Sequence, residues 1–350
     1  MFGIKRRKNI LVLGHKGMLG HDVYEYFQKL SCDKKSDIGV VTGFDKDCGL
    51  DLLTRRALSE WMNKSIHYDW CINCIAYTDT KSEESTDEGK KTGYMLNAIL
   101  PGFIAEACAW HKTKLVHIST DYVFSEYAEP SMPSGFCPWD APFPKNEYGK
   151  HKLIGELAVK NTMGFNDYAV LRTSWIYSTN NCKSFIHKFL KNCIKKYAVV
   201  TSETPVPVGV TSNEYSIPTS CAFLVKCIDK VIHGNVRGVN HAVPGRGNGP
   251  VDGVSRYYFA KAVLEDVIKE TASPRLLAVL KGILVEPVLN SGYYPARSTL
   301  CSTFQFMGNW RYYLDEFICQ NIKSIEDYCT RILDEESVSM PTESEAEATA

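Results

Sequence analysis

The chain has 350 residues, of which 44% are hydrophobic and 23% are charged, so it is long and apolar enough for two joined domains with a sizeable core. Its 40 basic and 40 acidic residues cancel, which argues against nucleic acid or an anionic membrane as a partner. No apolar stretch approaches the roughly 20 residues of a membrane span, and the basic start has no signal-peptide cleavage site. The 13 scattered cysteines are typical of reduced thiols. We therefore expect a cytoplasmic protein that binds a small molecule.

The first element is an apolar strand candidate at 10–13, which runs into Gly14, Gly17 and Gly20 and then into a helix candidate at 21–30. A glycine at a strand end permits a tight turn, and a backbone without side chains lets a pyrophosphate reach the amides at the helix N-terminus. The spacing is GxxGxxG, not the GxGxxG of the usual dinucleotide fingerprint. The motif alone therefore leaves an ordinary turn open.

Further strand candidates at 39–44, 71–76, 114–119 and 168–172 alternate with helix candidates at 55–63, 94–111 and 148–160. This alternation predicts an α/β fold with a doubly wound parallel sheet of the Rossmann type. We expect an NAD(P)-binding domain at 1–178, joined by a returning segment at about 209–238 that contains a helix candidate at 217–231. A smaller, partly discontinuous substrate-binding region would occupy about 179–208 and 239–333, and the acidic tail at 334–350 is expected to be disordered.

One pair of cysteines has a spacing found in metal sites. Cys71 and Cys74 form a CxxC, but they lie in the strand candidate at 71–76, where residues three apart face opposite sides. No second pair completes the four ligands of a zinc site. We interpret both as packing residues and expect no metal.

Tyr148 and Lys152 form a YxxxK at the start of a helix candidate, which puts the phenol and the ammonium one turn apart on one face. A nearby cation can make a phenol a useful acid near neutral pH. The strand at 114–119 ends in Ser119, Thr120 and Asp121, at the sheet edge where ligands bind in doubly wound folds. Such hydroxyls could hold a carbonyl oxygen, although they could also simply cap the next turn.

The end of the second strand candidate bears on the choice of coenzyme. Asp45 can bond the ribose hydroxyls of NADH and repel the 2′-phosphate of NADPH, while Lys46 beside it could accept that phosphate. Asp45 could also be only a turn residue. Either NADH or NADPH therefore remains open.

Together these motifs resemble the extended short-chain dehydrogenases/reductases, and most closely the dTDP-4-dehydrorhamnose reductase family. The matching segments lie at 14–20, 73–78, 95–98 with 101–102, 117–124, 146–152 with 155–156, and 171–177. Beyond residue 180 the resemblance is carried by Pro295, Ser298 and Leu300. It implies reduction of a nucleotide-linked 4-keto-6-deoxy sugar by NADH or NADPH in deoxysugar, rhamnose-type, biosynthesis.

The resemblance also assigns site residues. It makes Thr120, Tyr148 and Lys152 catalytic, with Asn97 supporting them, and places Asp121, Tyr122 and Trp175 with Thr120 at the substrate. The residues implied to bind the coenzyme are Gly14, Gly17, Met18, Leu19, Gly20, Asp45, Asp51, Leu52, Ile75, Ala76, Tyr77, Tyr148 and Lys152. For Trp175, packing at a domain junction is an equal alternative.

Departures from the family pattern gather where the substrate would be recognised. Tyr294 stands where these reductases carry an arginine before the late proline, and Arg297 follows just beyond it. The loop at 125–141 is enlarged. Two other functions stay open: a noncatalytic NAD(P)-binding subunit resembling the regulatory subunit of methionine adenosyltransferase, and a nucleotide-sugar epimerase or dehydratase. The oligomeric state is not readable, and a homodimer is one option.

Overall fold

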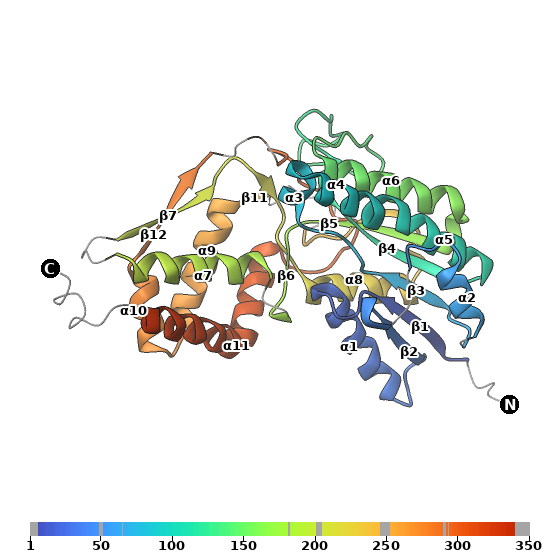
Figure 1. Cartoon of the computed structure of the whole chain (residues 1–350), viewed down its shortest axis with the longest axis horizontal. Coiled ribbons are helices and arrows are strands. Elements are labelled where there is room, and N and C mark those ends of the chain that lie inside the picture. Colours follow the sequence, from blue (N-terminus) through green and yellow to red (C-terminus); the bar gives the residue numbers. More distant parts are fainter. Residues whose placement is uncertain are drawn as a thin grey trace.

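The computed structural model describes residues 6–48, 52–64, 66–180, 183–200, 205–245, 253–289, 292 and 294–339. Figure 1 shows two parts side by side, a large parallel sheet flanked by helices and a smaller, mainly helical part. Within the described ranges, no helix combines the length and the apolar composition that a membrane span requires.

The large part is built on a six-stranded sheet whose strands are all parallel, in the order β10-β5-β4-β3-β1-β2. Its strands are β1 (Lys8–Leu13), β2 (Ile38–Phe44), β3 (Trp70–Asn73), β4 (Lys114–Thr120), β5 (Tyr168–Thr173) and β10 (Gly238–His241). The strand order reverses between β1 and β3, and in such sheets ligands bind beyond the carboxyl ends of the strands at that point. This confirms the predicted doubly wound fold.

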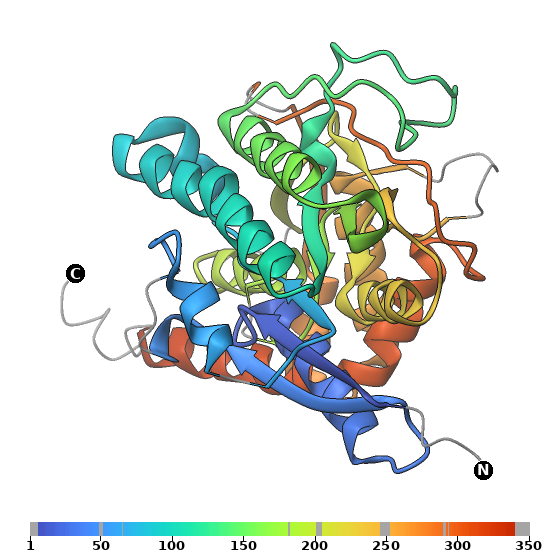
Figure 2. The same ribbon diagram turned by 90° about the vertical axis from the view of Figure 1, so that its right-hand side faces the viewer.

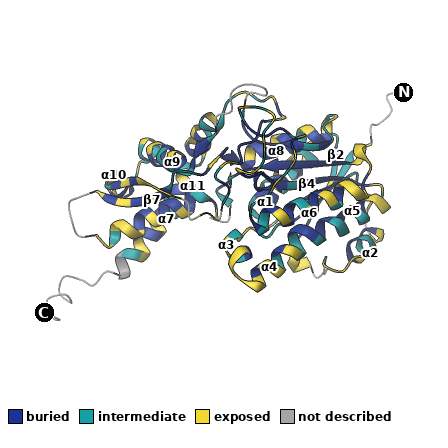
Figure 3. Ribbon diagram, turned by 90° about the horizontal axis from the view of Figure 1, so that it is seen from above, coloured by how far each residue is buried: buried dark blue, intermediate teal, exposed yellow. Residues whose placement is uncertain are grey.

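Helices cover both faces of this sheet because its central strands carry apolar residues on both sides, as in the consecutive buried residues 10–13 of β1. Ile10 and Val12 pack on one face with α1 (Met18–Cys32) and α8 (Cys221–His233). Leu11 and Leu13 pack on the other face, whose helices are α2 (Ala57–Asn63), α5 (Leu100–Trp110) and α6 (Glu147–Thr162). Figure 3 shows the strands dark blue, and Figure 2 shows α5 and α6 lying along one face with α1 on the other. The helix expected at 217–231 is α8, which spans 221–233 and packs on the same face as α1.

Short elements lie between the strands and the longer helices of this part. They are α3 (Thr80–Ser85), α4 (Asp87–Gly93), the π-helix η2 (Tyr94–Ile99) and the 3₁₀ turns η1 (Lys46–Cys48), η3 (Asp121–Val123) and η4 (Phe165–Asp167). The single helix expected at 94–111 is thus a π turn followed by α5. Such π turns are rare in proteins, and those that occur are often found at functional sites.

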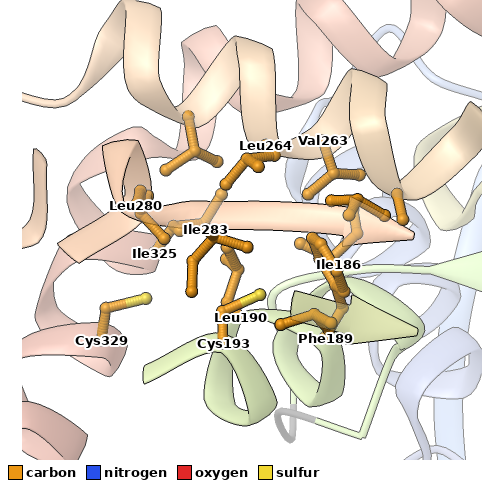
Figure 4. Close-up of a cluster of buried hydrophobic side chains, with 14 of the residues drawn as sticks. Ile186, Phe189, Leu190, Cys193, Val263, Leu264, Leu280, Ile283, Ile325 and Cys329 are labelled. Carbon is orange, nitrogen blue, oxygen red and sulfur yellow. The ribbon is translucent and has the colours of Figure 1, made fainter. Parts of the chain in front are cut away.

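The smaller part has its own apolar core, drawn in Figure 4. Its main elements are α7 (Phe185–Ala198), α9 (Arg256–Glu270), α10 (Pro274–Lys281), α11 (Trp310–Ser339) and the parallel pair β7 (Val206–Thr211) and β12 (Ile283–Val288). Two further strand pairs join β6 (Ile176–Tyr177) to β9 (Thr219–Ser220) and β8 (Tyr215–Ser216) to β11 (Val254–Ser255).

Several expected boundaries differ from the structure. β3 ends at Asn73, before the predicted residue 76, because the Asn73 side chain accepts the N–H of Ile75 at 3.1 Å and turns the chain. β10 lies in the main sheet beside β5, although residues from 239 onward were expected in the substrate-binding region, and β7 lies outside it. α11 continues to Ser339, so residues 334–339 are helical and not disordered, whereas 340–350 lie outside the described residues.

The packing interpretation of the CxxC is confirmed. Cys71 is buried in the core on one face of the sheet, and Cys74 packs against the core on the other face. The two thiols therefore do not converge on one ion.

Candidate active site

The turn after β1 has the shape that its glycines predict. Gly14 adopts a φ of +77°, and a Cβ added to Gly20 would lie 2.0 Å from the Gly14 carbonyl oxygen. Gly17 is the N-cap of α1, and no side chain caps this helix end. The first-turn N–H groups of α1 are therefore suited to an anion. The Leu19 side chain is buried and Met18 packs beside it, so these two could contribute through their backbone.

Asp45 lies at the carboxyl end of β2, next to this turn. Its carboxylate accepts the Lys16 N–H at 3.1 Å and the Lys46 N–H at 2.8 Å. The Lys16 ammonium pairs with Asp47 at 2.9 Å. Asp45 thus carries the negative charge where an adenosine ribose is read in this fold. Of the other two positions expected there, Leu52 packs against the core and Asp51 lies outside the described residues.

The loop after β3 is held by one buried side chain. Asn97, on η2, donates to the Tyr77 carbonyl at 2.9 Å and accepts the Tyr77 N–H at 3.0 Å. Ile75 approaches Gly14, whose added Cβ would lie 3.1 Å from its side chain. The structure therefore brings Ile75 beside the glycine turn and fixes the backbone of Tyr77 on Asn97. The π turn places Asn97 inward, where it has no exposed surface.

Tyr148 and Lys152 lie one turn apart on α6, against the end of β4. The Lys152 ammonium is 1% exposed and donates to the Ile118 carbonyl at 2.7 Å. Burial lowers the pKa of Lys152 to about 8, against the opposing effect of Glu156, Glu83 and Cys74. Burial also raises the pKa of the Tyr148 phenol, and a hydrogen bond with Thr120 acts against this shift. Tyr148 and Lys152 thus both bond to the carboxyl-terminal part of β4, the first through Thr120 and the second through Ile118.

Asp121 ties β4 to segments that are distant in the sequence. Its carboxylate accepts the Ser216 hydroxyl at 2.7 Å and the Ser298 hydroxyl at 2.6 Å. Burial raises the pKa of Asp121 to about 6, partly offset by hydrogen bonds from Ser298, Ser216 and Thr120. Ser298 was noted in the sequence only as part of a late motif, and its function here is to anchor that segment at the strand end.

A cation that sequence reasoning missed lies beside Tyr122. Arg256, the first residue of α9, donates to Glu214 at 2.7 Å and to the Tyr122 hydroxyl at 3.1 Å. Its guanidinium stacks over the Trp175 ring at 4.2 Å. Trp175 has a φ of +41°, and its indole N–H is buried without a hydrogen-bond partner among the described residues. Strained backbone and unsatisfied polar groups are frequent at functional sites.

Tyr294, from the altered late motif, also lies beside Tyr122. The Tyr294 ring is 6.0 Å from the Tyr122 ring, and the Tyr122 ring is 5.9 Å edge-on to Tyr148. Arg297 points elsewhere, because its guanidinium donates to the Pro133 carbonyl at 2.9 Å. The cation nearest to Tyr122 is thus Arg256, while Arg297 fastens the loop at 125–141.

A buried ion pair joins α6 to the carboxyl ends of β4 and β5. Arg172 and Glu156 pair at 2.8 Å, and Glu156 accepts the Ser119 hydroxyl at 2.5 Å. Ser119 therefore faces this pair, whereas the Thr120 hydroxyl donates to Asp121 at 3.2 Å and accepts the Tyr122 N–H at 3.2 Å, so Thr120 also caps the turn η3. Among the described residues, no three metal-ligating side chains of His, Cys, Asp or Glu gather at one point.

Comparisons with known proteins show what this chain is similar to. The family model described as "RmlD substrate binding domain" matches residues 8–314. A dTDP-4-dehydrorhamnose reductase of Mycobacterium tuberculosis is 34% identical over 201 residues, which are 57% of this chain and 60% of that protein. The aligned part thus spans less than two thirds of that relative.

Two further relatives align over most of their length. A dTDP-4-dehydrorhamnose reductase of Salmonella typhimurium is 26% identical over 310 residues, which cover 86% of this chain and 92% of that protein. The crystal structure of a dTDP-4-dehydrorhamnose reductase of Clostridium acetobutylicum superposes with a TM-score of 0.70 at 26% identity, covering 89% of this chain and 98% of that one.

Proposed function

Because the chain belongs to the RmlD substrate-binding domain family, we propose that it is an NAD(P)H-dependent reductase of a nucleotide-linked 4-keto-6-deoxy sugar. Relatives named for this activity, one of them aligned over 92% of its length, support the proposal. The observation that carries it is the hydrogen bond of Tyr148 with Thr120 at the carboxyl end of β4, with the Lys152 ammonium one turn along α6 bonded to the Ile118 carbonyl of the same strand. The product would be a deoxyhexose of the rhamnose type.

The glycine turn fits a dinucleotide. The open N-terminus of α1 would hold the pyrophosphate, and the close approach of Gly20 to Gly14 keeps the turn free of side chains. Residues 75–77 would line the nicotinamide side. We propose that Asp45 favours NADH by bonding the ribose hydroxyls, with NADPH the alternative. When bound, the coenzyme supplies the hydride.

Tyr148 would act as the general acid. Hydride addition builds negative charge on the carbonyl oxygen, and Tyr148 is placed to protonate that oxygen while the Thr120 hydroxyl donates a hydrogen bond to it. A charged Lys152 makes the phenol more acidic in the reacting complex, because a nearby cation favours the phenolate. Lys152 would also bond the nicotinamide ribose.

The sugar nucleotide would lie against Asp121, Tyr122 and Trp175. We add Arg256 to this set, since its guanidinium stacks on Trp175 and bonds Tyr122. Arg256 would face the anionic diphosphate, in place of the arginine that Tyr294 replaces. The cytoplasmic location, a homodimer and the division into a coenzyme-binding and a substrate-binding domain stay predictions.

The test is oxidation of NADH and NADPH, followed by absorbance, with dTDP- and UDP-linked 4-keto-6-deoxyhexoses. We expect turnover with one sugar, and we expect Tyr148→Phe to lower it by roughly 10²- to 10⁴-fold with little change in coenzyme affinity. Full activity of Tyr148→Phe would remove that residue from proton transfer. Coenzyme binding without turnover of any sugar would favour the regulatory-subunit function, and conversion without net oxidation would favour an epimerase or dehydratase.

A further inference from the structure

We propose that Glu83 and His151 form a positioning pair that holds the catalytic face of α6 and keeps Lys152 protonated during the reaction. Glu83 lies on α3, and His151 lies on α6 directly before Lys152. Neither residue would touch the substrate or the coenzyme. The reading of the pair as part of a reductase rests on the proposed function, whereas its effect on Lys152 does not.

The pair is buried and closely bonded. Glu83 has no exposed surface, and its carboxylate lies 2.6 Å from the His151 ring nitrogen Nδ1. The other carboxylate oxygen accepts the Asn97 amide at 3.5 Å. Among the described residues, His151 is the only salt-bridge partner of Glu83. A carboxylate buried in this way is costly unless it is paired and hydrogen-bonded, so the contacts that hold it are specific.

The surrounding backbone leaves a space for this carboxylate. A Cβ added to Gly93, at the end of α4, would lie 2.2 Å from Glu83 Oε1. Any larger residue at 93 would displace the carboxylate. Asn97 also holds the backbone of Tyr77, so one network joins Glu83 to the coenzyme loop and to the catalytic helix. This arrangement is more than a solvated surface pair.

The charge of Glu83 acts on both catalytic groups. It raises the pKa of Lys152 and the pKa of Tyr148. The other groups that face these two are Glu156 on α6, Cys74 after β3, His117 on β4, and Asp121 and Tyr122 after β4. His151 is further contacted by Glu147 at 3.8 Å and by the Tyr94 ring at 5.4 Å. The two carboxylates that raise the pKa of Lys152 have different partners. Glu156 pairs with the guanidinium of Arg172, whereas Glu83 bonds to the imidazole of His151.

Removing this charge should therefore change the pH range of activity. The pKa of Lys152 is about 8, so a small further decrease would deprotonate a large fraction of the ammonium near neutral pH. A neutral Glu83 substitute lowers this pKa, and the alkaline limb of the turnover profile moves to lower pH. A residue with only a structural role would lower activity or stability without moving that limb.

The experiment measures turnover against pH at saturating coenzyme and sugar for the wild type, Glu83→Gln and Glu88→Gln. Glu83→Gln keeps the size of the side chain and one of its two acceptor oxygens but removes its charge, and we expect the alkaline limb to move down by about half a unit to one unit. Glu88 is an exposed acid on α4, so Glu88→Gln should keep the wild-type profile. Glu83→Asp, whose carboxylate is withdrawn by one methylene, should fall between, and it replaces Glu83→Gln if that variant does not fold.

A second readout does not require activity. NMR titration of ¹³C-labelled lysine, assigned with Lys152→Arg, follows the Lys152 midpoint directly, and this midpoint should move down in Glu83→Gln by the same amount. An unchanged midpoint in a folded variant would overturn the proposal even if the enzyme is active. If the protein reduces no sugar but the midpoint moves, the proposed function fails while the pairing stands.

Discussion

Lys152 is predicted to destabilise the folded protein at neutral pH, because its ammonium is buried where its charge is poorly solvated. Burial lowers its pKa from 10.5 to about 8, and the side chain is only 1% exposed. One pKa unit corresponds to ~1.36 kcal/mol, so the charged form costs about 3 kcal/mol. The folded state then binds fewer protons than the unfolded state at alkaline pH, and stability must rise with pH in that range.

The sign can be measured against a variant that does not titrate. In Lys152→Met the charge is absent, so the free energy of unfolding of the wild type should gain about 2 kcal/mol relative to this variant between pH 7 and pH 9.5. The assay is urea unfolding of both proteins at several pH values. Comparing the two cancels the other tyrosine and cysteine titrations.

Lys160→Met supplies the control, since Lys160 is an exposed residue near the end of the same helix. Its stability difference from the wild type should stay flat across this pH range. A flat difference for Lys152→Met as well, or one that falls as the pH rises, would refute the argument that the Lys152 ammonium is held in a poorly solvating site.

Further predictions concern the coenzyme and substrate sites. Gly20→Ala should cost about 1–3 kcal/mol of stability and weaken coenzyme binding, because its Cβ would lie 2.0 Å from the Gly14 carbonyl oxygen. Gly102→Ala, whose Cβ would have its nearest contact at 3.4 Å, should be tolerated. Thermal melts and coenzyme titration check both variants. Asp45→Ala should raise the NADPH-to-NADH ratio of kcat/KM about tenfold or more, because like charges near a surface repel by about 1–4 kcal/mol; an unchanged ratio would leave Asp45 a turn residue. Arg256→Met is made together with Glu214→Gln so that no charge is left unpaired. The double variant should raise the KM for the sugar nucleotide at least about tenfold and leave the coenzyme Kd unchanged. Equal losses in sugar and coenzyme binding would indicate that the variant damages the whole structure.

The strands and the catalytic helix could be predicted because each depends on residues that are close together in the sequence. Five of the six strands of the sheet could be recognised because they are apolar runs that alternate with helical patterns, and Tyr148 and Lys152 because one helical turn separates them. β10 was missed because Gly238–His241 is short and partly polar, and its place in the sheet depends on the edge that β5 offers.

The site components that could not be predicted depend on contacts between distant residues. Arg256 bonds Tyr122 across a separation of 134 residues, and no local signal indicates this. Glu83 lies in a stretch of polar residues that is typical of a solvated surface, and only the folded chain encloses it. Long-range pairings of this kind arise from tertiary packing, which single-sequence pattern does not encode.

The chain passes repeatedly between its two parts, and this has a consequence for how it can be divided. After β5 the chain forms α7 and β7 in the smaller part and then α8 and β10 in the larger part. It next forms α9 and β12 in the smaller part, and Phe304 and Tyr313 then join the core of the larger part under α1 and α8. A fragment ending near residue 178 would expose the apolar face that α8 covers and the unpaired edge of β5, which invites aggregation. The protein should therefore fold, tolerate truncation and evolve as one unit, with insertions accepted in its loops but neither half separable from the other.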